Sequence, residues 1–155
     1  MKTIIAGSRD IIDYNLLLTA IDLAKDNDIH VTEVVCGMAW GADMLGRRYA
    51  ILNNLPLHDF PADWETHGNR AGYLRNIEMS ENADSLIALW DGASKGTHNM
   101  IDIADEKGLK KIVYIPVKAA RNIILLFFRF FSSVFKKSTA SAFLPASTIN
   151  VAYNV

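Results

Sequence analysis

The chain has 155 residues, of which 50% are hydrophobic and 21% are charged, and its formal net charge is −1. These values fit one compact domain and exclude both a disordered chain and a fibrous repeat. The single cysteine, Cys36, excludes a disulfide framework and any metal site built from several thiolates.

Short apolar runs alternate along the chain with segments whose apolar residues recur at helical spacing. The expected strands are 3–6, 31–36, 55–60, 85–90 and 111–115. The expected helices are one capped by Asp13, then 42–52, 71–82 and 97–107. Strands that alternate with helices pair in parallel through right-handed crossovers. The pattern therefore predicts an open, parallel α/β sheet of about five strands with helices on both faces.

Ligands of such sheets bind beyond the carboxyl ends of the strands. Here that rule selects the loops 7–10, 37–43, 61–70 and 91–97. These loops contain most of the residues whose chemistry suits a binding site.

Gly7, Ser8 and Arg9 follow the first expected strand. Glycine permits close approach of a backbone, serine offers a hydroxyl, and arginine is a charge-assisted donor to phosphate or carboxylate. The alternative is an ordinary strand-to-helix turn with a solvated arginine.

Gly37, Trp40, Gly41 and Asp43 follow the second expected strand and precede a helix. Glycines before a helix can leave backbone N–H groups open to an anion. An exposed Trp40 would stack on a base, an interaction worth about 1–3 kcal/mol. In the alternative reading Trp40 packs beside a tight turn at Gly41, and Asp43 only caps the helix.

Asp91, Gly92, Ser94, Gly96 and Thr97 lie between the fourth expected strand and the next helix. The Asp91 carboxylate is placed to accept ribose hydroxyls, whereas Gly96 and Thr97 offer a phosphate the free N–H groups of a helix start. Two such helix starts at one sheet edge predict a site for a phosphorylated ligand.

The histidines show no spacing typical of a metal site, so we expect neither a metal nor a cofactor. They are dispersed at His30, His58, His67 and His98.

Five segments in order resemble the YspA/cpYpsA-related branch of the SLOG superfamily, which also contains the LOG (Lonely guy) phosphoribohydrolases and DNA-processing protein A. The segments are 5–9, 36–43, 60–64, 71–79 and 88–97. The resemblance covers about residues 1–117 and implies a Rossmann-like sheet with a site for a nucleotide or nucleotide-derived ligand. Related domains are proposed to sense or process such ligands in bacterial and phage conflict systems.

The LOG motifs that the chain resembles indicate whether a bound ligand would also be cleaved. Arg75 stands where those enzymes have arginine, but Asn76 replaces their lysine and Met100 replaces their glutamate. Cleavage of an N-glycosidic bond needs a carboxylate to stabilise an oxocarbenium-like centre, and a thioether cannot do this. Asp91 and Arg75 are therefore the candidate catalytic residues if the chain is an enzyme, and binding without cleavage is the favoured interpretation.

Charge divides the chain into two parts. Residues 1–117 hold 17 acids against 11 bases, a net of −6, and residues 118–155 hold five bases and no acid, a net of +5. The acidic body argues against nucleic-acid binding. The expected domains are a SLOG-type domain at 1–117 and an extension at 118–155.

The extension begins with an expected amphipathic helix at about 119–137, followed by a tail. This helix would pack on the domain or on a second subunit, which favours a homo-oligomer. The alternative is adsorption of its basic and aromatic face to an anionic membrane surface. No apolar signal segment follows Met1, so we expect a cytoplasmic protein.

The leading hypothesis is a module that binds a nucleotide or an ADP-ribose-like ligand at the carboxyl edge of the sheet, in signalling or phage–host conflict. One alternative is a nucleotide N-glycosidase that uses Asp91. Another is a protein that handles single-stranded DNA.

Overall fold

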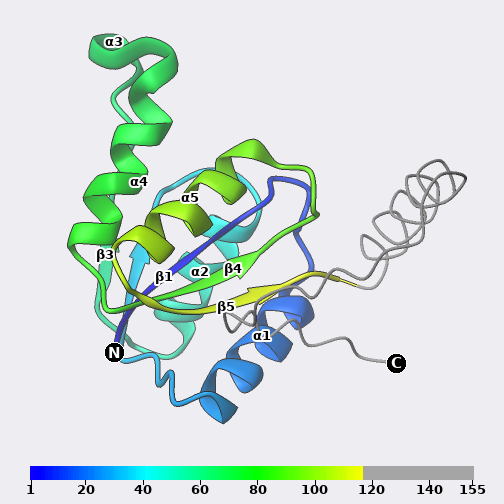
Figure 1. The fold of residues 1–155 in the computed structure, drawn as a ribbon. Helices are drawn as coiled ribbons and strands as arrows, with labels where there is room; N and C mark the ends of the chain where they lie inside the picture. The colour runs from blue at the N-terminus through cyan, green and yellow to red at the C-terminus, as the bar shows by residue number, and fades with distance from the viewer. Residues whose placement is uncertain (117–155) are drawn as a thin grey trace, which may run out of the picture.

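The computed structural model describes residues 1–116, and a five-stranded parallel sheet forms its centre (Figure 1). The strands are β1 (Lys2–Gly7), β2 (Glu33–Cys36), β3 (Leu57–Asp59), β4 (Ser85–Leu89) and β5 (Lys110–Tyr114). Their order in the sheet is β3-β2-β1-β4-β5, and every neighbouring pair is parallel. The predicted open, parallel α/β sheet is confirmed.

Helices cover both faces of the sheet. The four long ones are α1 (Tyr14–Asp26), α2 (Ala42–Leu52), α4 (Ala71–Glu81) and α5 (Lys95–Glu106). Ile5 of β1 belongs to the core cluster that includes α1 and α2, whereas its neighbour Ile4 belongs to the cluster that includes α4 and α5. This alternation explains why every residue of β4 is buried and apolar or small.

The order of the strands creates a switch point between β1 and β4. The chain runs from β1 outward to β2 and β3, and then crosses to β4 and β5 on the other side of β1. Loops that follow β1 and β4 therefore leave the sheet toward opposite faces, which is where open α/β sheets bind ligands. At their carboxyl ends β1 and β4 are still hydrogen-bonded to each other, because the Ser8 N–H, directly after β1, donates to the Leu89 carbonyl of β4 at 2.9 Å.

The segment between β3 and α4, expected to be a loop, contains the one-turn helix α3 (Trp64–His67) and the 3-10 turn η1 (Gly68–Arg70). The Asp63 carboxylate caps α3 by accepting the Thr66 N–H at 3.0 Å. No residue of α3 or η1 is buried, and Figure 1 shows α3 (green) standing clear of the sheet.

Two element boundaries differ from the expected ones for local reasons. Strand β3 is shorter than 55–60 because the Leu55 N–H bonds to the Ala50 carbonyl at 2.9 Å and so closes the end of α2. Helix α5 begins before Gly96 because the Ser94 hydroxyl accepts the Thr97 N–H at 3.3 Å and thereby sets the first turn.

The expected extension, with its amphipathic helix at about 119–137 and the tail, lies outside the described residues. Within residues 1–116 none of the helices has the length and apolar character that a membrane span requires.

Candidate functional site

A cleft of about 620 Å³ lies at the carboxyl ends of the strands, beside the switch point. The loops after β1, β2, β3 and β4 contribute to its lining, together with α4 and the first turns of α5. Its volume lies within the range of about 300–1,000 Å³ that is typical of small-molecule sites.

Most of the sequence-predicted site residues meet at this cleft. They are Gly7, Arg9, Gly37, Asp43, Arg75, Ser94, Gly96 and Thr97. Their chain positions are far apart, and the parallel sheet brings them together because successive strands end at the same edge.

Ser8 and Asp91 hold the loops that form the cleft but do not line it. Ser8 is buried, and its hydroxyl accepts the Asp91 N–H at 3.1 Å. The Asp91 carboxylate accepts the N–H groups of Ala93 and Ser94 at 2.9 and 2.8 Å. Burial raises the pKa of Asp91, but the hydrogen bonds from Ser94, Ala93 and Ser8 together outweigh it, so the pKa lies below its ordinary value.

Three further predicted residues also lie outside the lining. Trp40 is 71% exposed on the surface next to α2. Gly41 is the N-cap of α2 at φ +86°, where a side chain would overlap the backbone of Arg9. Gly92 borders a smaller neighbouring cavity of about 290 Å³.

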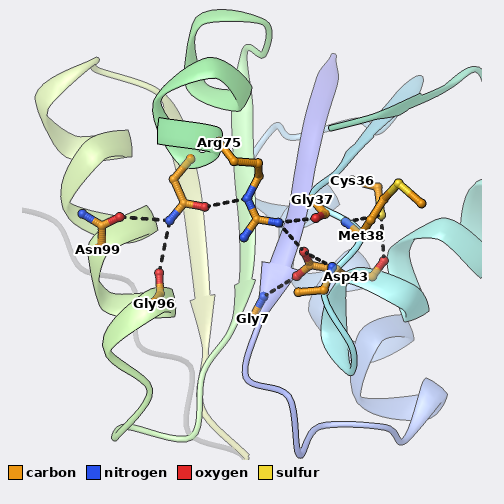
Figure 2. Close-up of polar contacts among 10 residues, drawn as sticks. Gly7, Cys36, Gly37, Met38, Asp43, Arg75, Gly96 and Asn99 are labelled. Carbon is orange, nitrogen blue, oxygen red and sulfur yellow. Dashed lines mark hydrogen bonds and ion pairs between the residues drawn. The ribbon is translucent and has the colours of Figure 1, made fainter. Parts of the chain in front are cut away.

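The floor of the cleft, defined here as Gly37, Asp43 and Arg75, is a buried ion pair braced by backbone groups (Figure 2). An Asp43 carboxylate oxygen lies 3.5 Å from Arg75 Nη1, and the two side chains are only 3% and 14% exposed. The same carboxylate accepts the Gly7 and Ala39 N–H groups at 3.3 Å each. Asp43 therefore does not cap α2 with its side chain.

Burial raises the pKa of the Asp43 carboxyl, while the Arg75 guanidinium and the two backbone N–H donors oppose that rise. Every polar atom of this buried carboxylate has a partner. Asp43 is thus committed to holding Arg75 and the loops after β1 and β2, and it is not free to attack a ligand.

Gly37 makes the position of Arg75 possible. The Arg75 Nη1 donates to the Gly37 carbonyl, and its guanidinium lies over the glycine. A Cβ at Gly37 would overlap this guanidinium and would lie 2.7 Å from an Asp43 carboxylate oxygen.

Asn76 continues the polar chain from the floor to α5. Its side-chain oxygen accepts the Arg75 Nε–H at 3.1 Å. Its amide nitrogen donates to Asn99 Oδ1 at 2.9 Å and to the Gly96 carbonyl at 3.4 Å, as Figure 2 shows. This chain fixes α4 and the α5 N-terminus relative to each other across the cleft.

Several donors in the cleft are left unused by the fold. The backbone N–H groups of Lys95 and Gly96 at the start of α5 have no hydrogen-bond partner within residues 1–116, and neither has Arg75 Nη2. Arg9 and Lys95 line the cleft as exposed side chains. With Arg75 they make three cations against one carboxylate, so the cleft favours an anion.

The outer wall of the cleft, defined here as Trp64 and Tyr73, was not among the sequence-predicted site residues. Both side chains line the cleft, and they are 55% and 48% exposed. One feature of the sequence favoured Trp64 as a site residue, because Trp64 lies in the predicted loop 61–70, which follows an expected strand. Loops 37–43 and 61–70 both line the cleft as expected, but no local pattern showed that Trp64 rather than Trp40 would be the tryptophan on its surface.

The sequence of the chain is similar to those of known proteins. Residues 1–67 match the YspA, cpYpsA-related SLOG family. The chain is also 36% identical over 119 residues to the gene 61 protein of Mycobacterium phage D29, an alignment that covers 72% of this chain and 94% of the phage protein. The chain belongs to the YspA, cpYpsA-related SLOG family.

In this SLOG chain Met100 is 1% exposed and belongs to the hydrophobic core that borders the cleft. Asp43 is the only carboxylate that lines the cleft within residues 1–116. Within the described residues, no carboxylate that lines the cleft is therefore left without partners.

Cys36 of the SLOG domain is a structural thiol. It is buried, its Sγ–H donates to the Asp43 carbonyl at 3.4 Å, and it accepts the Met38 N–H at 3.4 Å. Burial raises the pKa of this thiol to about 11, so it stays protonated at neutral pH and is a poor nucleophile. No group of side chains suited to hold a metal ion occurs in residues 1–116.

Proposed function

We propose that the cleft binds a nucleotide or a nucleotide-derived, ADP-ribose-like ligand without cleaving it. The observation that carries this proposal is that the cleft has unused N–H donors but, within residues 1–116, a single carboxylate, which the fold fully occupies. The unused donors are the backbone N–H groups of Lys95 and Gly96 in α5 and the Nη2 of Arg75.

The proposed arrangement assigns a part of the ligand to each side of the cleft. Phosphate oxygens accept the free N–H groups of Lys95 and Gly96, where the helix dipole adds to the attraction. Arg75 Nη2 supplies a charge-assisted donor from the floor. Gly7 and Arg9 hold the end of the ligand that lies nearest to β1.

The residues that line the cleft in the described part of the chain support binding without hydrolysis. N-glycoside cleavage needs a carboxylate beside the sugar carbon, but Asp43 is saturated, Met100 is apolar, and Asp91 lies outside the lining. A module that binds a signal molecule and leaves it intact suits a role in signalling or phage–host conflict. Similarity to a phage-encoded protein supports that role.

Isothermal titration of the full chain tests the proposal, with AMP, ADP, ADP-ribose and cyclic ADP-ribose as the panel. We expect one ligand per chain, a binding constant that falls with added salt, and no release of free base. Lys95→Ala should weaken binding about tenfold, because an interaction with a charged group is worth about 1.5–3 kcal/mol before solvent screening reduces it.

Lys110→Ala is the matched control, because Lys110 is an exposed lysine that does not line the cleft. It should leave the affinity unchanged. If no member of the panel binds to the folded chain, the proposed function is wrong. Release of free base that Asp91→Asn abolishes would instead support the glycosidase.

A further inference from the structure

The outer wall combines two properties that rarely coincide in a stable fold. Trp64 and Tyr73 line the cleft, and yet they remain about half exposed, at 55% and 48%. Large aromatic side chains usually gain from burial, and those that border a cavity while exposed are typical of ligand contacts. The floor that lines the same cleft is polar and cationic.

Local contacts hold Trp64 in place without burying it. The Trp64 N–H donates to the Ala62 carbonyl at 3.1 Å, and the Asp63 cap fixes the turn that follows. The far edge of the indole lies 3.5 Å from the position that a Cβ on Gly72 would occupy. Because Gly72 has no side chain, the edge of the ring lies close to α4, on which Tyr73 is the next residue.

We propose that Trp64, assisted by Tyr73, is a stacking wall that selects ligands carrying a planar ring in addition to phosphate. This inference rests on the proposed function, because the phosphate is held by the α5 N-terminus and Arg75. A nucleobase joined to a ribose phosphate has both parts. Indole presents a large apolar face to such a base, and stacking of this kind tolerates different bases.

The other two tryptophans do not serve this purpose. Trp40 is more exposed, at 71%, but it does not line the cleft. Trp90 is half-buried, and its indole N–H donates to the Ser94 carbonyl at 3.1 Å. Trp40 is therefore a matched control for Trp64, since both are exposed indoles on the described surface.

The experiment titrates the full chain with three probes, namely AMP, ribose 5-phosphate and adenosine. In the unmodified protein AMP should bind more tightly than ribose 5-phosphate by a factor of about 5 to 150, the range that stacking on one aromatic side chain supplies. Trp64→Ala should remove this advantage and leave the affinity for ribose 5-phosphate unchanged. Trp64→Phe should retain part of it, and Trp40→Ala should retain all of it.

The outcomes separate this inference from the proposed function. If AMP and ribose 5-phosphate bind equally well, or if Trp64→Ala keeps the full preference for AMP, the stacking wall is refuted while phosphate binding stands. If adenosine binds in a Trp64-dependent way but ribose 5-phosphate does not bind at all, the wall stands and the phosphate site fails. If none of the probes binds to the folded chain, both proposals fail.

Trp64→Ala should fold normally, because no residue of α3 or η1 is buried. Circular dichroism checks this directly. If Trp64→Ala does not fold, Trp64→Phe and Tyr73→Ala replace it in the titration. The proposal is overturned if both of these variants keep the full preference for AMP over ribose 5-phosphate.

Discussion

The floor and the outer wall of the cleft face the same space, but they depend on the fold in opposite ways. The floor is a buried ion pair whose carboxylate is fully used to join β1, the loop after β2, α2 and α4, while Arg75 keeps one donor, Nη2, free within residues 1–116. In the outer wall, Trp64 belongs to α3, in which no residue is buried, and Tyr73 is a half-exposed side chain on the first turn of α4. One side of the site is therefore part of the core, and the other is an addition to it.

This difference separates the effects of substitution. A change in the floor should alter stability and binding together, because the same groups serve both. A change in the outer wall should alter binding alone.

Removal of the Asp43 carboxylate should have the largest effect. Asp43→Ala leaves a buried guanidinium unpaired and two backbone N–H groups without their acceptor. Breaking a buried pair in this way typically costs about 3–5 kcal/mol. Chemical denaturation monitored by circular dichroism measures the free energy of unfolding.

Asp59→Ala is the control, since it removes a carboxylate whose ion pair with Arg47, at 3.3 Å, is about one third exposed. We expect a loss below about 1 kcal/mol. Asp43→Asn keeps the shape and one acceptor, so it should fall between the two. Equal losses in Asp43→Ala and Asp59→Ala would mean that the floor is not part of the core.

Two glycines of the cleft offer a sharper contrast. Gly37→Ala places a Cβ on the Arg75 guanidinium, so it should lower stability by about 1–3 kcal/mol and abolish nucleotide binding. Gly96→Ala meets no atom within 4 Å. Because alanine favours a helix, it should raise stability by about 0.5–1 kcal/mol, yet its methyl group should weaken binding where the ligand approaches the backbone.

Thermal unfolding and titration with AMP measure the two effects on the same samples. A stable Gly96→Ala chain that binds AMP as well as the unmodified protein would place the ligand elsewhere. A Gly37→Ala chain as stable as the unmodified protein would show that the Arg75 guanidinium moves away from residue 37 with no loss of folding free energy.

Asp91→Asn should have the smallest effect. The pKa of Asp91 is below its ordinary value in the folded state, so its stabilising contribution is present above the unfolded pKa and is lost as the pH falls through the folded pKa. The variant should therefore be slightly less stable than the unmodified protein at pH 7, by less than about 1 kcal/mol, and the difference should vanish in acid.

Denaturation at several pH values measures this difference. Affinity for AMP should change little, because Asp91 orders the loop from outside the cleft. A loss of binding as large as that expected for Gly37→Ala would instead assign Asp91 to the ligand.

The sequence was sufficient for the sheet and for the loops that meet at its edge. Buried strands such as 85–90 and the helix at 42–52 have periodicities that local patterns reveal, and parallel strands necessarily bring their following loops together. The eight predicted residues that line the cleft follow from this topology, and the family resemblance is confirmed for residues 1–67.

Other parts of the site depend on distances that no local pattern encodes. The pairing of Asp43 with Arg75 and the link from Asn76 to Asn99 require knowledge of how α4 lies against α2 and α5. The sequence suggested Trp40 for stacking because it follows β2, but its side chain lies outside the cleft lining, and Trp64 lines the cleft.

Amide chemical-shift mapping during titration of the ¹⁵N-labelled full chain with AMP tests the central claim most directly. We predict that the largest shift changes occur at Gly37, Lys95 and Gly96, whose backbones border the cleft. The amide of Lys25, at the far end of α1, should not respond. Changes confined to residues away from the cleft, or none in a folded chain, would contradict the account.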